Sequence, residues 1–381
     1  MKILVAVDSF KGSLSSLEAG NAIRKGIENA EAGAKVIVRP LADGGEGTAE
    51  AITDAAHGEH VSIMVTGPLG EKVCCDYGII EKEKKAIIEM SGAAGITLVP
   101  LAKRNPMKTT TRGVGEVIAD AINRGCRHFI IGIGGSATND GGIGMLQALG
   151  FEFLDKNGNQ VPYGGDGLSR INSIRTENVI SMLGECDFQI ACDVNNPLCG
   201  TNGSSAVFGP QKGATPDMVM KLDKALNRYA ALTNLKKNTS FESCPGAGAA
   251  GGLGFAFLSY MNARLESGFT IVAKETNLEQ YISEADIIIT GEGRIDSQTV
   301  MGKAPIGVAA LARKHSKKVI AIGGSVAADA GVCNKHGIDA LFSITREPVE
   351  LEDAMKPENA AANLSLTAEQ IIRLIGCVNS K

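Results

Sequence analysis

Short apolar runs, glycine-rich loops and amphipathic segments alternate at both ends of the chain, and this alternation restricts the possible folds more than any other feature. The run Lys2–Val7 is followed by a polar loop and by Ser15-x-x-Glu18, a spacing typical of a helix capping box. The runs Asp286–Thr290 and Lys318–Ile322 near the C-terminus again end in glycine loops. Buried strands that alternate with helices predict a largely parallel sheet covered by helices.

The pattern changes between about residues 60 and 90, where three apolar runs are joined only by short turns, as in antiparallel strands. Strands and helices alternate again after this region. The length of 381 residues suggests two or three domains. The sequence therefore predicts an α/β protein with two α/β domains. A doubly wound, Rossmann-like domain is built from both chain ends, residues 1–75 and 285–381, and a second α/β domain, residues 76–284, is inserted between them.

The charge and cysteine content exclude several classes of partner. The 38 basic and 42 acidic residues give a net charge of −4 without a block of like charge, whereas nucleic-acid-binding proteins carry a cationic surface. Nine cysteines without a CxxC pair favour free thiols in a reducing compartment over disulfides or a zinc site. No apolar run reaches the ~18–20 residues of a membrane span, and the N-terminal run is too short for a signal peptide. We expect a soluble, cytoplasmic protein that binds neither nucleic acid nor a membrane; the sequence does not predict its oligomeric state.

Several predicted strands end in loops that combine glycine with a carboxylate and often with a cation. Ligands of doubly wound sheets bind beyond the carboxyl ends of the strands. A single carboxylate there is more often a turn or cap residue, but several together favour a site for phosphate and metal. The residues concerned are Asp8 with Lys11, Asp43 with Glu46, Asp193, and Asp296 with Arg294.

The loop Gly134–Gly142 is the strongest candidate for an anion site, because glycines leave backbone N–H groups free at the start of a helix. The glycines at 132 and 134, with Glu152 further on, also match part of the dinucleotide-binding fingerprint. However, the polar loop continues where that fingerprint requires a helix. An NAD-dependent hydroxy-acid dehydrogenase is therefore the weaker alternative.

A Walker A sequence is absent. The nearest Gly-Lys pair, Gly302-Lys303, is followed by Ala304 where a P-loop requires Ser or Thr, which excludes a P-loop kinase. Lys303 fits equally well as a phosphate ligand or as a solvated loop lysine.

Longer blocks of the sequence resemble the glycerate kinase type-1 family. In chain order, these blocks are Asp8–Gly12, Pro40–Thr48, Gly132–Gly142, Asp193–Leu198, Phe208–Gly213, Pro245–Gly252 and Gly291–Thr299. They follow one another across essentially the whole chain. The resemblance implies a two-domain α/β kinase that phosphorylates D-glycerate with ATP and Mg²⁺, and in bacterial members the product is generally 2-phosphoglycerate.

The chemistry of phosphoryl transfer suggests roles for the strand-end residues. The reaction needs a base for the substrate hydroxyl, cations for the transferring phosphate and carboxylates for Mg²⁺. We expect Asp193 to be the general base, with Asp296 as the second candidate. Lys11 and Arg294 are candidates to neutralise phosphate or the substrate carboxylate, and Asp8 and Asp43 to hold Mg²⁺ directly or through water. The expected anion-binding set is Gly134, Gly135, Ser136, Thr138, Asn139, Asp140 and Lys303.

The residues alone leave three points open: the place of the active site, the identity of the hydroxy-acid, and whether the protein is an enzyme at all. We expect the active site in the cleft between the two domains, where closure would exclude water. A kinase of a neighbouring hydroxy-acid would need the same residues. A non-enzymatic sensor of a small sugar acid is less consistent with the sequence, because so many strand-end carboxylates would repel an anionic ligand in the absence of a metal.

Overall fold

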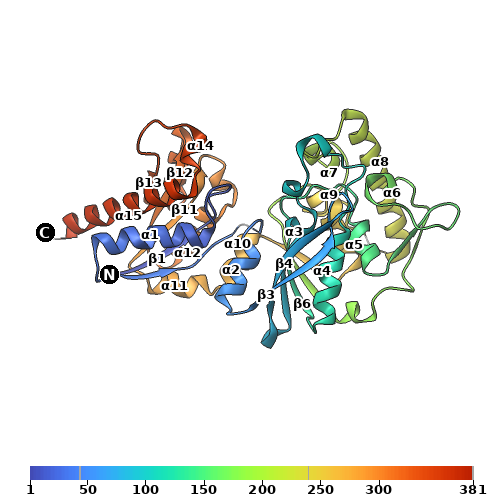
Figure 1. Cartoon of the computed structure of the whole chain (residues 1–381), viewed down its shortest axis with the longest axis horizontal. Coiled ribbons are helices and arrows are strands. Elements are labelled where there is room, and N and C mark those ends of the chain that lie inside the picture. Colours follow the sequence, from blue (N-terminus) through green and yellow to red (C-terminus); the bar gives the residue numbers. More distant parts are fainter. Residues whose placement is uncertain (43, 239, 380–381) are drawn as a thin grey trace. The chain divides into compact units, whose positions relative to one another are not determined.

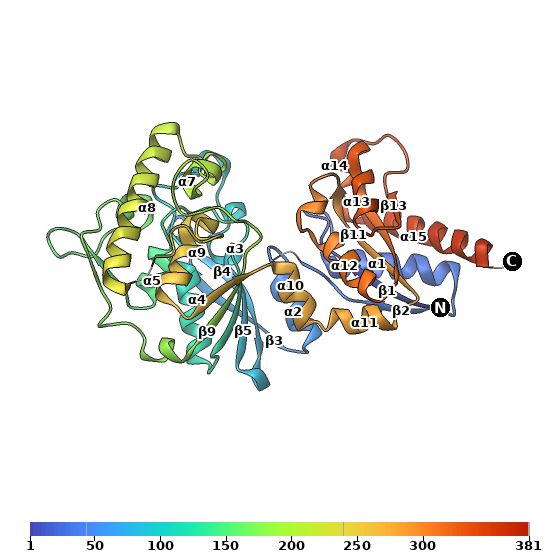
Figure 2. The same ribbon diagram turned by 180° about the vertical axis from the view of Figure 1, so that it is seen from behind.

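The computed structural model describes residues 1–42, 44–238 and 240–379 and divides into two compact units (Figures 1 and 2). The terminal unit comprises Met1–Asp43 and Phe269–Lys381, and the inserted unit comprises Gly44–Gly268. The sequence predicted boundaries at 75/76 and 284/285, whereas the contacts divide the chain at 43/44 and 268/269. The strands that follow residue 58 pair within the sheet of the inserted unit.

A five-stranded parallel sheet forms the centre of the terminal unit, with the strand order β13-β12-β11-β1-β2. Its strands are β1 (Lys2–Val7), β2 (Lys35–Val38), β11 (Ile287–Ile295), β12 (Lys318–Val326) and β13 (Ala340–Ser343). The order runs in opposite directions on the two sides of the β1–β11 pair, so this pair is the topological switch point at which doubly wound sheets bind ligands. The predicted doubly wound domain from both chain ends is confirmed.

Seven α-helices accompany this sheet in the described part of the terminal unit. They are α1 (Ser16–Ala30), α10 (Gly268–Glu275), which begins at the unit boundary, α11 (Leu278–Glu284), α12 (Ala304–Lys314), α13 (Val332–Lys335), α14 (Leu351–Ala354) and α15 (Pro357–Asn379). Of these helices, α1, α11 and α12 contact the strands of the sheet directly. Helix α1 begins with the predicted capping box, in which Ser15 and Glu18 each accept a hydrogen bond from the other's backbone N–H. Helices α1 and α15 lie side by side (Figures 1 and 2), and Gly26 allows their close approach because a Cβ there would lie 2.0 Å from the Ser365 carbonyl oxygen.

The inserted unit is built around a six-stranded mixed sheet with the order β10-β9-β6-β5-β4-β3. Its strands are β3 (Glu59–Thr66), β4 (Lys72–Ile80), β5 (Lys85–Glu89), β6 (His128–Gly132), β9 (Asp187–Ala191) and β10 (Ala263–Glu266). Strand β4 is antiparallel to both of its neighbours, β3 and β5, as the sequence predicted, and β5, β6, β9 and β10 are parallel. The carboxyl ends of β5, β6 and β9 therefore lie at one edge of the sheet.

Eight α-helices and a small two-stranded sheet accompany this sheet in the described part of the inserted unit. The helices are α2 (Thr48–Ala55), α3 (Met90–Ala94), α4 (Arg112–Asn123), α5 (Ile143–Ala148), α6 (Gly164–Leu168), α7 (Ser204–Phe208), α8 (Pro216–Lys237) and α9 (Ala249–Tyr260). The small sheet consists of the antiparallel strands β7 (Glu152–Leu154) and β8 (Ser173–Arg175), with α6 between them in the sequence. An apolar core that includes Phe129, Phe188 and Phe257 joins the sheet to the helices. Within the described residues, we find no helix with the length and apolarity needed to span a membrane.

Two strands of the terminal unit are longer than the sequence predicted. The residues after Thr290 were expected to form a loop, but β11 continues to Ile295, and β12 likewise continues through its glycines to Val326. Glycine is needed at position 291 because a Cβ would lie 2.1 Å from the Ile322 carbonyl oxygen on the neighbouring strand. This glycine permits close strand packing rather than a turn, and it places Glu292 and Arg294 on a strand.

Candidate functional site

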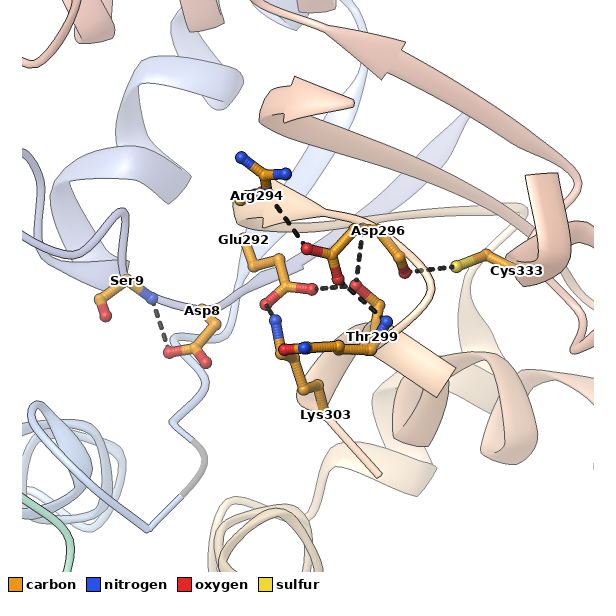
Figure 3. Close-up of polar contacts among 9 residues, drawn as sticks. Asp8, Ser9, Glu292, Arg294, Asp296, Thr299, Lys303 and Cys333 are labelled. Carbon is orange, nitrogen blue, oxygen red and sulfur yellow. Dashed lines mark hydrogen bonds and ion pairs between the residues drawn. The ribbon is translucent and has the colours of Figure 1, made fainter. Parts of the chain in front are cut away.

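One candidate set of residues lies at the carboxyl ends of β1 and β11 in the terminal unit. The parallel register pairs Val7 with Gly291, and the Asp8 N–H donates to the Gly291 carbonyl at 2.9 Å. The Asp8 side chain is buried, and its carboxylate accepts a hydrogen bond from the Ser9 N–H at 2.6 Å. Figure 3 shows that Asp8 enters this region from β1, whereas Glu292, Arg294 and Asp296 come from β11 and the residues directly after it.

Glu292 holds Lys303 in this set. Its carboxylate accepts hydrogen bonds from Thr299 Oγ1 at 2.7 Å and from Lys303 Nζ at 3.0 Å (Figure 3). Burial raises the pKa of Glu292, while the two hydrogen bonds oppose this shift. Lys303 stands at the N-cap of α12 and is thus a paired lysine rather than the fully solvated one that the sequence allowed.

Asp296 forms the second polar group of the terminal unit. Desolvation opposes its ionisation, but hydrogen bonds from the Gln298 N–H at 3.0 Å and from Arg294 Nε at 3.1 Å hold its pKa below the usual range. In Figure 3, Arg294 contacts one carboxylate, that of Asp296, and 68% of the Arg294 side chain is exposed to solvent. The guanidinium therefore has donors left for an anionic ligand.

Lys11 lies in the turn that follows β1, and its side chain is exposed. A Cβ at Gly293 would lie 3.6 Å from the Lys11 backbone nitrogen, which places this turn beside β11. The terminal unit thus brings Asp8, Lys11, Arg294, Asp296 and Lys303 to one sheet edge.

The predicted metal ligands can be compared with the structure only in part. Asp43 lies outside the described residues. Among the residues that are described, no three His, Cys, Asp or Glu side chains are grouped as a metal site would require. Mg²⁺ usually takes only one or two protein carboxylates and completes its shell with water and phosphate, so a single buried carboxylate such as Asp8 fits its chemistry.

A second candidate set lies at the carboxyl edge of the inserted sheet, where the segment Gly44–Thr48 crosses the strand ends. A Cβ at Gly132, the last residue of β6, would lie 2.5 Å from the Gly44 carbonyl oxygen. A Cβ at Gly44 would lie 2.8 Å from the Cβ of Ala191, at the end of β9. Only glycine fits at these two positions, which explains part of the glycine pattern of the sequence.

Asp193 follows β9 at this edge. Its side chain is exposed, and its Oδ1 accepts a hydrogen bond from the Gly268 N–H at 3.1 Å. The parallel register places β9 next to β6, which leads into the Gly134–Gly142 loop. The predicted base and the predicted anion loop thus emerge from neighbouring strands.

The loop Gly134–Gly142 is only partly open to solvent. Gly134 and Gly135 are exposed, whereas the residues from Ser136 to Asp140 are buried. The structure of this loop does not favour dinucleotide binding. The dinucleotide-binding fingerprint requires a helix to begin at its glycines, whereas helix α5 begins only at Ile143.

Asp140 and Asn139 belong to the predicted anion-binding set, and both are completely buried and hydrogen-bonded within the protein. The Asp140 carboxylate accepts from the N–H and hydroxyl of Thr111 at 2.8 and 2.9 Å, and from the N–H groups of Gly142 and Gly144 at 3.0 and 3.4 Å. Burial raises its pKa, and these hydrogen bonds oppose the shift. The Asn139 side chain donates to Ser205 Oγ at 2.8 Å. The Thr138 Oγ1 atom is buried without a hydrogen-bond partner in the described part of the chain.

Lys212, which the sequence did not single out, contacts the predicted anion loop from inside the protein. It is only 2% exposed, and its Nζ donates to Ser136 Oγ and to the Thr138 carbonyl, both at 2.7 Å. Burial lowers its pKa to about 7, although the charge of Asp140 opposes the shift. The lysine lies in the block Phe208–Gly213, but a lysine in a short turn normally indicates solvent exposure, so its role was not recognised.

Glu89, at the end of β5, is the second residue that sequence reasoning missed. Its register partner is Gly132, and its Oε1 accepts from the Ala49 N–H at 2.8 Å. It thereby caps helix α2, whose N-cap residue Gly47 has no side chain to do so. Burial raises the pKa of Glu89 to about 7, with Glu46 and Glu50 adding to the shift and the backbone donors opposing it.

The raised pKa of Glu89 predicts a pH-dependent stability. The unfolded carboxyl group loses its proton near the ordinary value of 4.5, whereas the folded one keeps it up to about 7. The folded state therefore holds the extra proton in this window, and its stability falls as the pH rises through it. Glu89→Gln removes this loss, so its free energy of unfolding relative to wild type should rise by roughly 3 kcal/mol between pH ~4 and pH ~8. Urea unfolding at both pH values measures the free energy of unfolding of the variant relative to the wild type, with the exposed Glu81→Gln as control. If this relative free energy were the same at both pH values for Glu89→Gln, the raised pKa would not belong to Glu89.

The comparisons with known proteins agree with the fold and with the sequence blocks. A profile described as the Glycerate kinase family matches residues 3–376. The Glycerate kinase of Bacillus subtilis (strain 168) is 49% identical over 371 residues, 97% of each chain, and the Glycerate 2-kinase of Escherichia coli (strain K12) is 48% identical over 356 residues, 93% of each chain. A crystal structure of a Salmonella typhimurium LT2 protein assigned as glycerate kinase 2 superposes with a TM-score of 0.90 at 47% identity and covers 100% of both chains. The chain belongs to the glycerate kinase family.

Proposed function

We propose that this protein is a glycerate kinase that transfers the terminal phosphate of ATP to the 2-hydroxyl of D-glycerate with the help of Mg²⁺. The observation that carries this proposal is the sequence identity of 49% and 48%, over nearly the full length of the chain, to proteins named Glycerate kinase and Glycerate 2-kinase. A match at this level over both units includes all the strand-end segments described above.

The chemistry of the two sheet edges supports a phosphotransfer reaction. The inserted unit offers the exposed backbone of Gly134 and Gly135 with the hydroxyl of Ser136, which suits a phosphate or a carboxylate. The terminal unit offers the cations Lys11, Arg294 and Lys303 beside carboxylates. Phosphoryl transfer depends mainly on positioning and on neutralising charge, and these groups provide both.

Within this proposal, Asp193 is the general base and Asp296 the alternative. The lowered pKa of Asp296 keeps it ionised, but its bonds to Arg294 and Gln298 occupy the carboxylate. Asp193 is more exposed, and thus more accessible to a substrate hydroxyl. Asp8 would hold Mg²⁺, alone or with Asp43; the bound ion would neutralise phosphate charge.

A kinase of a related small hydroxy-acid is the second candidate, because the same residues would serve any substrate with a carboxylate beside a hydroxyl. An assay of ADP release across D-glycerate, L-glycerate, tartronate and other hydroxy-acids distinguishes the two, and phosphorus NMR identifies the phosphorylated hydroxyl. We expect ADP release that requires both Mg²⁺ and D-glycerate, with 2-phosphoglycerate as product. A clear preference for another acid would replace the substrate assignment, and no ADP release with any of them would refute the kinase proposal.

A further inference from the structure

Lys212 is a buried cation that the proposed reaction leaves without a role. A lysine that is only 2% exposed is costly unless its ammonium group is hydrogen-bonded. Both of its hydrogen bonds go to one segment, Ser136 and Thr138, which directly follows the exposed glycines Gly134 and Gly135. The side chain thus supports the anion loop from inside the protein.

The chemistry of the Lys212–Ser136 contact determines what Ser136 can do. Lys212 Nζ donates this bond and Ser136 Oγ accepts it. The hydroxyl proton of Ser136 is not used in the contact and can be donated elsewhere. Accepting a bond from a cation also polarises the hydroxyl and makes it a stronger donor.

The neighbouring carboxylate does not compete for this proton. Asp140 already accepts hydrogen bonds from Thr111, Gly142 and Gly144, and these donors shape the loop beyond Ser136. Its charge also balances part of the charge of Lys212, which favours the ammonium form. Asp140 and Lys212 therefore fix the loop on both sides of Thr138.

We infer that Lys212 is a positioning residue that holds Ser136 so that its hydroxyl donates a hydrogen bond to an anionic oxygen of a substrate bound at Gly134–Ser136. This inference rests on the proposed function, in which the loop binds an anion. The oxygen belongs either to the carboxylate of the hydroxy-acid or to a phosphate of the nucleotide. Lys212 does not touch the substrate; it acts through Ser136.

A double-mutant cycle with Ser136→Ala and Lys212→Met tests the inference. Loss of a hydrogen bond to a charged group typically weakens binding about 10- to 100-fold. We expect each single variant to raise the KM of the same substrate by this factor, with little change in kcat. The KM of the double variant should not exceed that of the more affected single variant, because both changes remove the same interaction. An increase in the KM of glycerate assigns the carboxylate, and an increase in the KM of ATP assigns the phosphate.

Several results would overturn the inference. Unchanged KM values for both substrates in Ser136→Ala would do so alone, and this variant removes only one oxygen atom. Effects of Ser136→Ala and Lys212→Met that multiply in the double variant would show that Lys212 acts independently of Ser136. If Lys212→Met does not fold, Lys212→Gln takes its place, since it retains N–H donors without the charge. The exposed Lys221→Met is the matched control and should leave both KM values unchanged.

The same variants separate this inference from the proposed function. If the wild-type protein does not phosphorylate glycerate, the proposed function fails. Titration calorimetry with ATP and with glycerate then still measures whether Ser136 and Lys212 contribute jointly to binding of an anion. If the wild type is active but the cycle shows no coupling, only the inference about Lys212 fails.

Discussion

Replacement of Asp193 by asparagine is expected to lower kcat by about 10²–10⁴-fold, the contribution typical of a general base. Asparagine keeps an oxygen that can accept the Gly268 N–H, so the local structure should persist. It cannot take a proton from the substrate hydroxyl. Steady-state kinetics with the coupled ADP assay measure the loss, and the thermal midpoint should stay close to that of the wild type.

Asp187→Asn is the matched control for this experiment, because Asp187 lies at the opposite end of the same strand, β9, and pairs with His128. It should keep nearly the full turnover. A kcat of Asp193→Asn close to that of the control would sink the assignment of Asp193 and transfer the role to Asp296.

Replacement of Asp140 by alanine should destabilise the inserted unit by about 3–5 kcal/mol, the scale expected when buried donors and a buried cation lose their partner. The change leaves the N–H groups of Thr111, Gly142 and Gly144 without their acceptor and removes the charge that faces Lys212. Urea or thermal unfolding, followed by circular dichroism, measures the loss.

Asp155→Ala provides the comparison for Asp140, because Asp155 also accepts backbone N–H groups, from Asn157 and Asn159, but in an exposed turn. Its replacement should have a much smaller effect on stability. If Asp140→Ala were as stable as the wild type but failed to bind substrate, Asp140 would be a ligand residue, as the sequence first suggested.

The sequence predicted features that depend on local residue patterns. The capping box at Ser15 and Glu18 was recognisable because both partners lie within one helical turn. Strand β1 was recognisable because a strand buried on both faces is an unbroken apolar run. The family was recognisable because its blocks are long and follow one another in order.

The sequence did not predict features that depend on residues far apart in the chain. Glycine was taken as a sign of a loop after Thr290, whereas Gly291 is required by the neighbouring Ile322 carbonyl and β11 continues. Lys212 became a candidate only once the structure showed its contact with Ser136, which lies 76 positions away in the sequence. Burial determines the roles of Asp140 and Glu89, and residue type alone does not reveal burial.

The pairing of β1 with β11 also has a consequence for synthesis of the protein on the ribosome. A hydrogen bond between Lys2 and Asp286 at the start of this pair joins positions 284 apart in the chain. All strands of the inserted unit, which end at Glu266, are translated before β11 exists. Until β11 is translated, β1 and β2 can pair only with each other, and the whole inserted unit is synthesised in the meantime. The terminal sheet can therefore be completed only late in translation.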